Sequence, residues 1–335
     1  MLSVKTYGKL YIAGEYQVLE KQGIAIVLGL KRYMELTIMP NDTFCYQSDD
    51  LFENHFEYNS NELKFNNNNN NEIVKATINV AFNYLRLNNI NITPFKIKIV
   101  SNLESDNGKK YGFGSSSAII TGLIKVITKY FKLTLSNEKL FKLSVIAQIT
   151  ANKLTSGGDL AAAIFGTLIL YQRYDLKWLL SYSNLYETLN LSWPDLLIEE
   201  IPTNLNFGAI WTKTSYHTPN IKLRLSKDNI DIAKDIVKNI KNGLIEDDYL
   251  NVYNGLINYQ HWFNTVLDSN EIITKEILKT LTVLDELNLS GKISGAGGGD
   301  SIIFMYQDNY DFNVLNKKLN ENNLELINLE VSDDK

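Results

Sequence analysis

A glycine- and serine-rich turn between a strand and a helix places the strongest constraint on this chain. Residues 108–118 contain three glycines and three serines; they follow a strand-like run at 95–103 and precede a helix-like run at 118–131. Glycines let a backbone approach an anion closely, serines can cap a helix, and the N–H groups of a helix start attract negative charge. The turn predicts phosphate binding, with an ordinary capped helix as the alternative from this segment alone.

Two further segments combine glycine with polar residues. Residues 5–16 indicate a strand ending in a glycine turn, and alternation would place Lys9 and Tyr11 on one face. Taken alone, Lys9 could equally be a solvent-exposed strand residue. In residues 155–163 a lone carboxylate, Asp159, follows a Ser-Gly-Gly turn. It could be a catalytic group beside a substrate hydroxyl or a simple helix N-cap, and the sequence leaves both open.

A third segment, residues 292–300, has four glycines immediately before a strand at 301–306. Glycine in an ordered element costs about 0.5–1 kcal/mol relative to alanine, so we expect a ligand or another backbone to approach this turn closely. Competing phosphate motifs are absent. The chain has no Gly-x-x-x-x-Gly-Lys-Ser/Thr, and the glycines at 295–299 precede a strand, where a dinucleotide fingerprint follows one.

The rest of the chain alternates strands and helices. Residues 23–39 predict a second and a third strand, and residues 49–72, which end in an asparagine run at 66–71, predict a polar surface loop. Helical spacing occurs at 73–87, 135–154, 228–241, 248–267, 271–288 and 312–322. Strands are expected at 196–201, 207–212 and 325–331.

Composition excludes several classes of protein. The 335 residues, 44% hydrophobic, are enough for two domains. A net charge of −5 and the lack of a basic run argue against nucleic acid. No stretch reaches about 18 uncharged apolar residues, so we expect no membrane partner, and the first residues lack the apolar core of a signal peptide. Cys45 is the only cysteine and is expected to pack in a reducing cytoplasm, while the three histidines show no metal-ligand spacing.

Together, residues 8–16, 112–118 and 294–299 resemble the three motifs of the GHMP small-molecule kinases, in the right order and over nearly the whole chain. The paired Lys109 and Lys110 and the later Asp300 are most similar to the bacterial phosphomevalonate kinases. The resemblance implies an α+β fold of two domains with the site between them. Residues 1–177 would form a ribosomal-S5-domain-2-like domain and residues 178–335 a ferredoxin-like α/β plait. It also implies a cytoplasmic monomer or homodimer.

The family's reaction and roles carry over as implications of that resemblance. The expected reaction is transfer of the ATP γ-phosphoryl group to (R)-5-phosphomevalonate, giving 5-diphosphomevalonate and ADP in the mevalonate pathway of isoprenoid biosynthesis. The resemblance assigns catalysis to Lys9, Lys109, Lys110 and Asp159. It assigns the ATP phosphates to Gly112, Gly114, Ser115, Ser116 and Ser117, and Mg²⁺ to Ser116 and Asp159. The implied acceptor-binding residues are Lys9, Tyr16, Ser156, Lys292, Ser294, Gly295, Ala296 and Gly297.

One departure from the family and one charge argument bear on the acceptor. Mevalonate kinases place a metal-binding glutamate eleven residues before the aspartate, where this chain has the neutral Gln148, a poorer Mg²⁺ ligand. Lys9, the Lys109–Lys110 pair and Lys292 are expected to gather at the acceptor end, which favours an acceptor that already carries a phosphate. The alternatives are mevalonate kinase or another GHMP kinase, and a catalytically silent GHMP-like binding protein.

Overall fold

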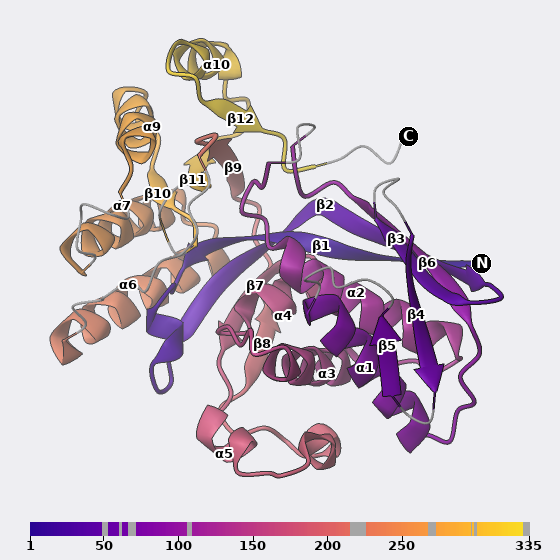
Figure 1. Ribbon diagram of the computed structural model, residues 1–335. Helices are drawn as coiled ribbons and strands as arrows, with labels where there is room; N and C mark the ends of the chain where they lie inside the picture. Colours follow the sequence, from indigo (N-terminus) through magenta and orange to yellow (C-terminus); the bar gives the residue numbers. More distant parts are fainter. Residues whose placement is uncertain are drawn as a thin grey trace.

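The computed structural model describes residues 1–48, 53–59, 62–65, 72–105, 109–214, 226–266, 273–295, 297 and 300–330, which form two β-sheets with their helices (Figure 1). The first sheet has the order β5-β4-β3-β6-β2-β7-β8, and β1 pairs with β2 off this path. Its strands are β1 (Leu2–Ala13), β2 (Ile24–Pro40), β3 (Phe44–Ser48), β4 (Asn54–Asn59), β5 (Glu62–Phe65), β6 (Phe95–Ser101), β7 (Leu168–Gln172) and β8 (Leu197–Glu200).

Helices cover one face of this sheet (Figure 1). The helices of this half are α1 (Glu72–Leu87), α2 (Ser115–Tyr130), α3 (Asn137–Thr150), α4 (Gly158–Phe165), α5 (Leu176–Leu180) and the short η2 (Leu185–Asn190). A further short helix, η1 (Gln17–Leu19), lies at the tip of the β1–β2 hairpin. The apolar residues of α2 are buried against β1 and β2, including Ile120, Leu123 and Ile127. This packing fixes the start of α2, and with it the glycine turn, above the middle of the β1–β2 pair.

The second sheet has the order β10-β11-β9-β12 and is antiparallel throughout. Its elements are β9 (Asn206–Trp211), α6 (Lys227–Ile245), α7 (Tyr249–Val266), α9 (Lys275–Glu286), β10 (Gly291–Ile293), β11 (Ser301–Tyr306), α10 (Phe312–Glu321) and β12 (Glu325–Ile327). Along the chain these elements run strand, helices, two strands, helix and strand, and together with the sheet order β10-β11-β9-β12 this forms a ferredoxin-like plait. The predicted α+β fold and its C-terminal plait are therefore confirmed.

The domain boundary after residue 177 stays a prediction, and the chain changes sheets further on. Strand β8 pairs with β7 in the first sheet, with Ile169 opposite Glu200, and α5 and η2 precede β8 along the chain. The second sheet begins only with β9 at Asn206. Sheet membership therefore changes between residues 200 and 206.

Two strand predictions differ from the structure. Residues 23–39 form one strand, β2, rather than two, because Gly29 and the charged residues after it produce a register shift against β1 instead of a turn. Residues 49–72 include β4 and β5 in place of a continuous loop. Phe56 of β4 stacks on Phe44 and Phe65 at centroid distances of 5.3 and 5.0 Å, which gives these polar strands an apolar anchor. The asparagine run at 66–71 lies outside the described residues.

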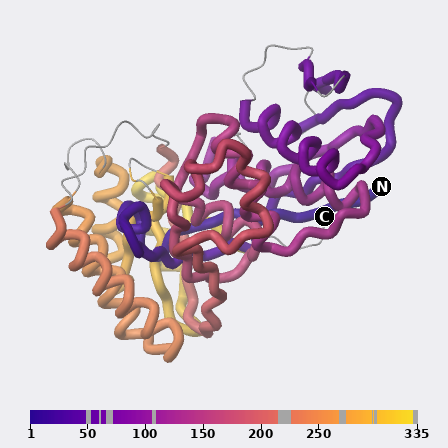
Figure 2. The backbone as a smooth tube through the Cα atoms, turned by 90° about the horizontal axis from the view of Figure 1, so that it is seen from below, coloured from indigo at the N-terminus to yellow at the C-terminus, as the bar shows by residue number. Residues whose placement is uncertain are grey.

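The tip of the β1–β2 hairpin reaches into the second half of the chain. Figure 2 shows its indigo loop beside the orange helices of that half. The hydroxyl of Tyr259 in α7 donates to the Glu15 carbonyl at 2.9 Å, and the Ser301 hydroxyl at the start of β11 donates to the Tyr111 carbonyl at 2.7 Å. These bonds bring the glycine segments at 5–16, 108–118 and 292–300, as far as the structure describes them, to one seam between the two halves. We call these three the glycine segments. Among the described residues, no helix is both long enough and apolar enough to span a bilayer.

Candidate active site

A cavity of about 470 Å³ lies at this seam, and we name it the Tyr16 cavity. It is lined by residues from all three glycine segments and from the turn before α4. The predicted site residues in its wall are Lys9, Tyr16, Gly112, Ser156, Asp159, Ser294, Gly295 and Gly297. The predicted Ala296 lies outside the described residues.

A second cavity of about 400 Å³, the Ser115 cavity, lies over the start of α2. The predicted residues that line it are Lys9, Lys110, Gly112, Gly114, Ser115, Ser116, Ser117 and Asp159. The N-cap of α2 is Gly114 in the left-handed conformation, with no side-chain cap, so the serines form the first helical turn instead of capping the helix. The first amides of a helix have no intrahelical acceptor. The free N–H groups and the positive end of the α2 dipole therefore face this cavity.

The two cavities share part of their walls. Lys9, Gly112, Thr155, Asp159 and Asp300 line both of them. A group bound in one cavity would therefore meet a group bound in the other beside one lysine and two carboxylates. This junction is the geometry needed to pass a charged group from one bound molecule to another.

Lys9 is held at the junction by the glycine turn. Its backbone N–H donates to the Phe113 carbonyl at 3.0 Å, and its Nζ donates to the Gly112 carbonyl at 3.1 Å. Gly114 has a φ of +78°, and a Cβ there would lie 3.0 Å from the Lys9 stem. The Nζ also lies 5.6 Å from the ring centre of Tyr11, as the predicted strand alternation requires. The ammonium is thus fixed in place before any ligand binds.

Asp159 is not a helix N-cap. Gly157, with a φ of +96°, caps α4 without a side-chain bond, and Asp159 is the second residue of the helix. The neighbouring Tyr11 hydroxyl lies 3.0 Å from the Ser156 hydroxyl. Burial raises the pKa of Tyr11 well above its usual value, and the negative charge of Asp159 raises that pKa further. Tyr11 therefore stays protonated as a hydrogen-bonding neighbour of the carboxylate.

The sequence indicated Asp300 as a family feature but not as a site residue. It adopts a φ of 59° and fills the space opposite Gly112, where a Cβ would lie 2.6 Å from the Asp300 Cβ. Burial raises the pKa of Asp300, while Lys9 and Lys110 oppose that rise. The position of Asp300 directly after the glycines at 295–299 is the feature of the sequence that could have identified it as a site residue. Thr155 and Glu15 are further wall residues that the sequence did not assign.

The structure separates the paired lysines. Lys110 lines the Ser115 cavity, whereas Lys109 lines neither cavity. The Lys109 backbone is tied to Ser105, whose side chain both donates to the Lys109 carbonyl and accepts from the Lys109 amide at 3.0 Å. Lys153, outside the predicted motifs, also lines the Ser115 cavity.

Lys292 was expected to contact the acceptor, and the structure places it outside the walls of both cavities. Its side chain is completely buried, lines neither cavity, and pairs with Glu15 at 2.5 Å. Burial lowers the pKa of Lys292, and the Glu15 charge opposes that change. Among the described residues, Lys9 is the one lysine in the Tyr16 cavity wall, so the structure does not bring the four lysines together there.

The oxygen chemistry of the Ser115 cavity suits a hard cation such as Mg²⁺. Ser116 and Asp159 line this cavity and offer a hydroxyl and a carboxylate. Gln148 lies there too, but its Oε1 already accepts from the Thr155 hydroxyl at 3.2 Å and the Thr155 amide at 3.4 Å. The neutral side chain thus organises the turn before Asp159.

A different cluster shows what the sequence could not place. The ligand atoms of Cys45, Glu53 and His55 lie within 4.8 Å of one another on β3 and the start of β4, although the histidines had seemed isolated from Cys45. The Lys96 ammonium pairs with Glu53 in this group. That cation stands where a metal ion would have to bind, so we assign no metal there.

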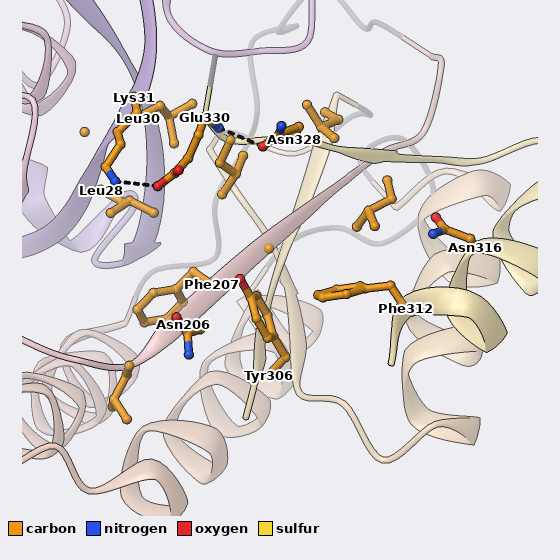
Figure 3. A pocket seen from close by; sticks show the side chains of 16 residues that line it. Leu28, Leu30, Lys31, Asn206, Phe207, Tyr306, Phe312, Asn316, Asn328 and Glu330 are labelled. Atoms are coloured by element: carbon orange, nitrogen blue, oxygen red, sulfur yellow. Dashed lines mark hydrogen bonds and ion pairs between the residues drawn. The ribbon is translucent and has the colours of Figure 1, made fainter. Parts of the chain in front are cut away.

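A third cavity, of about 660 Å³, lies where β2 faces β9 and β12 (Figure 3). Figure 3 shows Phe207, Tyr306 and Phe312 on its one side and the Lys31–Glu330 ion pair on the other. It contains none of the predicted site residues. The other two cavities, by contrast, contain Lys9, Lys110, Asp159 and the serines at the start of α2.

Comparison with known proteins agrees with this geometry. Residues 72–167 match the model of the GHMP kinases N terminal domain. The chain is 22% identical to phosphomevalonate kinase of Streptomyces sp. (strain CL190) over 324 residues, covering 88% of this chain and 86% of the relative. It is 24% identical to mevalonate kinase of Saccharolobus solfataricus over 314 residues, covering 90% and 89%.

A solved structure extends the match to the whole fold. The complex of Streptococcus pneumoniae phosphomevalonate kinase with phosphomevalonate and AMPPNP superposes with a TM-score of 0.87 at 25% identity, covering 98% of this chain and 99% of that one. Residues 72–167 thus match the GHMP kinase N-terminal domain, and over nearly its whole length the chain is similar to phosphomevalonate kinase and to mevalonate kinase.

Proposed function

We propose that this protein transfers the γ-phosphoryl group of ATP to (R)-5-phosphomevalonate, forming 5-diphosphomevalonate and ADP. The observation that carries the proposal is the shared wall of the two cavities, where Lys9 and Asp159 face both. The Ser115 cavity would hold the ATP phosphates and the Tyr16 cavity the acceptor. Phosphoryl transfer requires positioning and charge stabilisation more than covalent help from the protein, and this junction offers both.

In the transfer, an oxygen of the acceptor phosphate attacks the γ-phosphorus, and the bond from that phosphorus to the β–γ bridging oxygen breaks. The amides at the start of α2 would hold the phosphates, as helix N-termini commonly do. Lys9 would stabilise the charge on the transferred group from its fixed position, and Lys110 would do so from the nucleotide side. A phosphate acceptor is already largely ionised near neutral pH, so Asp159 would orient groups rather than remove a proton.

Mg²⁺, held with ATP by Ser116 and Asp159, would neutralise part of the phosphate charge. Both residues line the Ser115 cavity, and Gln148 does not replace the glutamate expected in mevalonate kinases because Thr155 occupies its oxygen. A neutral residue at this place is more compatible with an acceptor that brings its own negative phosphate.

The choice of acceptor rests on the likeness to phosphomevalonate kinase and on Gln148, since the lysine count no longer supports it. Mevalonate kinase is the second candidate because a curated mevalonate kinase matches the chain over a similar length. The two activities differ in one observable: the first requires a phosphate on the acceptor.

The test is a coupled ADP-release assay with mevalonate, phosphomevalonate, diphosphomevalonate, homoserine and galactose. We expect kcat/KM for phosphomevalonate to exceed that for mevalonate by at least about 10²-fold, which corresponds to roughly 2.7 kcal/mol. Equal or better turnover of mevalonate would assign the protein to the mevalonate kinases. Absence of turnover with every acceptor, in folded protein that binds ATP, would favour the catalytically silent alternative.

A further inference from the structure

A buried ion pair joins the two halves of the molecule beside the Tyr16 cavity. Glu15 lies at the tip of the β1–β2 hairpin, and Lys292 lies on β10 of the second sheet. Their side chains are 5% and 0% exposed, and Lys292 Nζ lies 2.5 Å from Glu15 Oε1. The same ammonium donates to the Tyr11 carbonyl at 3.4 Å. The ion pair thereby links the tip of the β1–β2 hairpin to a strand of the second sheet.

The Glu15 carboxylate also holds the third glycine turn. Its Oε1 accepts from the Gly295 amide at 3.1 Å, and the adjacent Ser294 hydroxyl accepts from the Tyr11 amide at 2.7 Å. A Cβ at Gly295 would meet nothing within 4 Å, so side-chain packing does not fix this residue. Within the second sheet, the Ser294 amide donates to the Ser301 carbonyl at 3.0 Å. The bonds from the N-terminal half add a second anchor for Ser294 and hold Gly295 in the cavity wall.

We propose that Glu15, charge-balanced by Lys292, is a positioning residue that fixes Ser294 and Gly295 for acceptor binding and so determines KM for the acceptor. The inference rests on the proposed function, because the acceptor is assigned to the Tyr16 cavity. Glu15 acts through the turn, and Lys292 keeps its buried carboxylate paired.

The energetics of a buried ion pair indicate that Glu15 and Lys292 position the turn rather than stabilise the fold. Taking two charges out of water is costly, and a buried pair is often no more stabilising than apolar groups of similar volume. Removing only one partner would leave a buried unpaired charge and could prevent folding. The informative variants therefore change both residues together.

Two double variants separate charge from position. Glu15→Gln with Lys292→Met removes the charges but keeps an oxygen that can accept from the Gly295 amide. Glu15→Leu with Lys292→Met removes that acceptor as well. The matched control is Lys31→Met with Glu330→Gln, because that ion pair has the same 2.5 Å distance and also joins the two halves, yet its side chains are 72% and 64% exposed.

We expect the Leu/Met variant to raise KM for phosphomevalonate by at least about tenfold, with KM for ATP changed less than about threefold. The Gln/Met variant should stay within about threefold of the wild type for both substrates, and the control should be unchanged within about twofold. Indistinguishable KM values for the two double variants would overturn the proposal. So would equal increases for both substrates, which indicate general loosening of the fold. Failure of the wild type to use phosphomevalonate would refute the function instead.

Hydrogen exchange gives a readout that does not need activity. In the unliganded state, the Gly295 amide should exchange at least about tenfold faster in the Leu/Met variant, which lacks the acceptor, than in the Gln/Met variant, which keeps one. Equal exchange in the two variants would contradict the proposed hold on the turn.

Discussion

Replacing Lys9 by methionine tests the junction of the two cavities most directly. Methionine keeps most of the stem that packs against Gly114 but removes the ammonium that Gly112 holds. The fold should survive, since Lys9 is half-buried and its backbone bond to Phe113 does not depend on the side chain.

The size of the expected loss follows from the position of the charge. Two unit charges about 4 Å apart interact by about 4 kcal/mol at an effective dielectric constant near 20, as at a partly solvated site. Part of that interaction is already present with bound ATP and does not accelerate the reaction. Loss of a preorganised donor to a developing negative charge costs about 2.7–4 kcal/mol, or about 10²–10³ in kcat. We therefore expect kcat of Lys9→Met to fall by about 10²–10³-fold.

The assay is steady-state ADP release with saturating ATP and phosphomevalonate, accompanied by a thermal melt. Lys5→Met is the matched control, because Lys5 lies on the same strand and lines neither cavity. Its kcat should stay within about twofold of the wild type. A folded Lys9→Met enzyme that keeps more than about a fifth of wild-type kcat would refute the assignment of Lys9.

Four further outcomes are expected. Asp159→Asn should fold normally and lower kcat by at least about 10²-fold in the ADP assay, because the orienting carboxylate at the junction is lost. Lys110→Met should lower kcat/KM for ATP by at least about tenfold and Lys109→Met by less than about twofold, since Lys110 lines the Ser115 cavity and Lys109 does not. Gly114→Ala should lower urea stability by about 1–2 kcal/mol, the cost of a left-handed alanine, and should also displace Lys9. Because the folded-state pKa of Asp300 is raised above its usual 3.8, the folded protein holds this proton to higher pH than the unfolded chain, and stability falls as pH rises above about 4. Asp300→Asn should therefore melt higher than the wild type at pH 7, and this advantage should shrink towards pH 4; a constant difference would contradict the proposed burial effect.

The sequence predicted most of the fold because its signals are local. Residues 73–87 show apolar spacing that α1 realises, and the glycine turn at 112–114 begins α2 close to the expected place. Strand β8 was also located, but its pairing with β7 was not. Pairing is a property of distant segments, so the sequence did not reveal that β8 belongs to the first sheet.

The charges at the site also depend on contacts between distant segments, which the sequence does not reveal. Lys9 and Lys292 are both strand lysines beside a glycine turn, and nothing local separates them. One is held at a cavity junction, while the other is buried against a glutamate 277 positions away. A count of lysines in the sequence cannot reveal which of them is paired with a carboxylate. The sequence therefore predicted more positive charge at the Tyr16 cavity than the structure places there.

The resulting balance of charge explains why the site uses so many glycines. In the Tyr16 cavity Glu15 is neutralised by Lys292, which leaves Lys9 with Asp159 and Asp300. One ammonium against two carboxylates cannot by itself hold an acceptor that carries a phosphate. Backbone amides have to supply the remaining attraction, and they do so without a counter-charge where glycines expose them or where a helix begins. Gly297 in one wall and the start of α2 across the junction can meet that requirement, whereas the Gly295 amide already donates to Glu15. Backbone amides would then contribute the electrostatics that lysines alone were expected to supply.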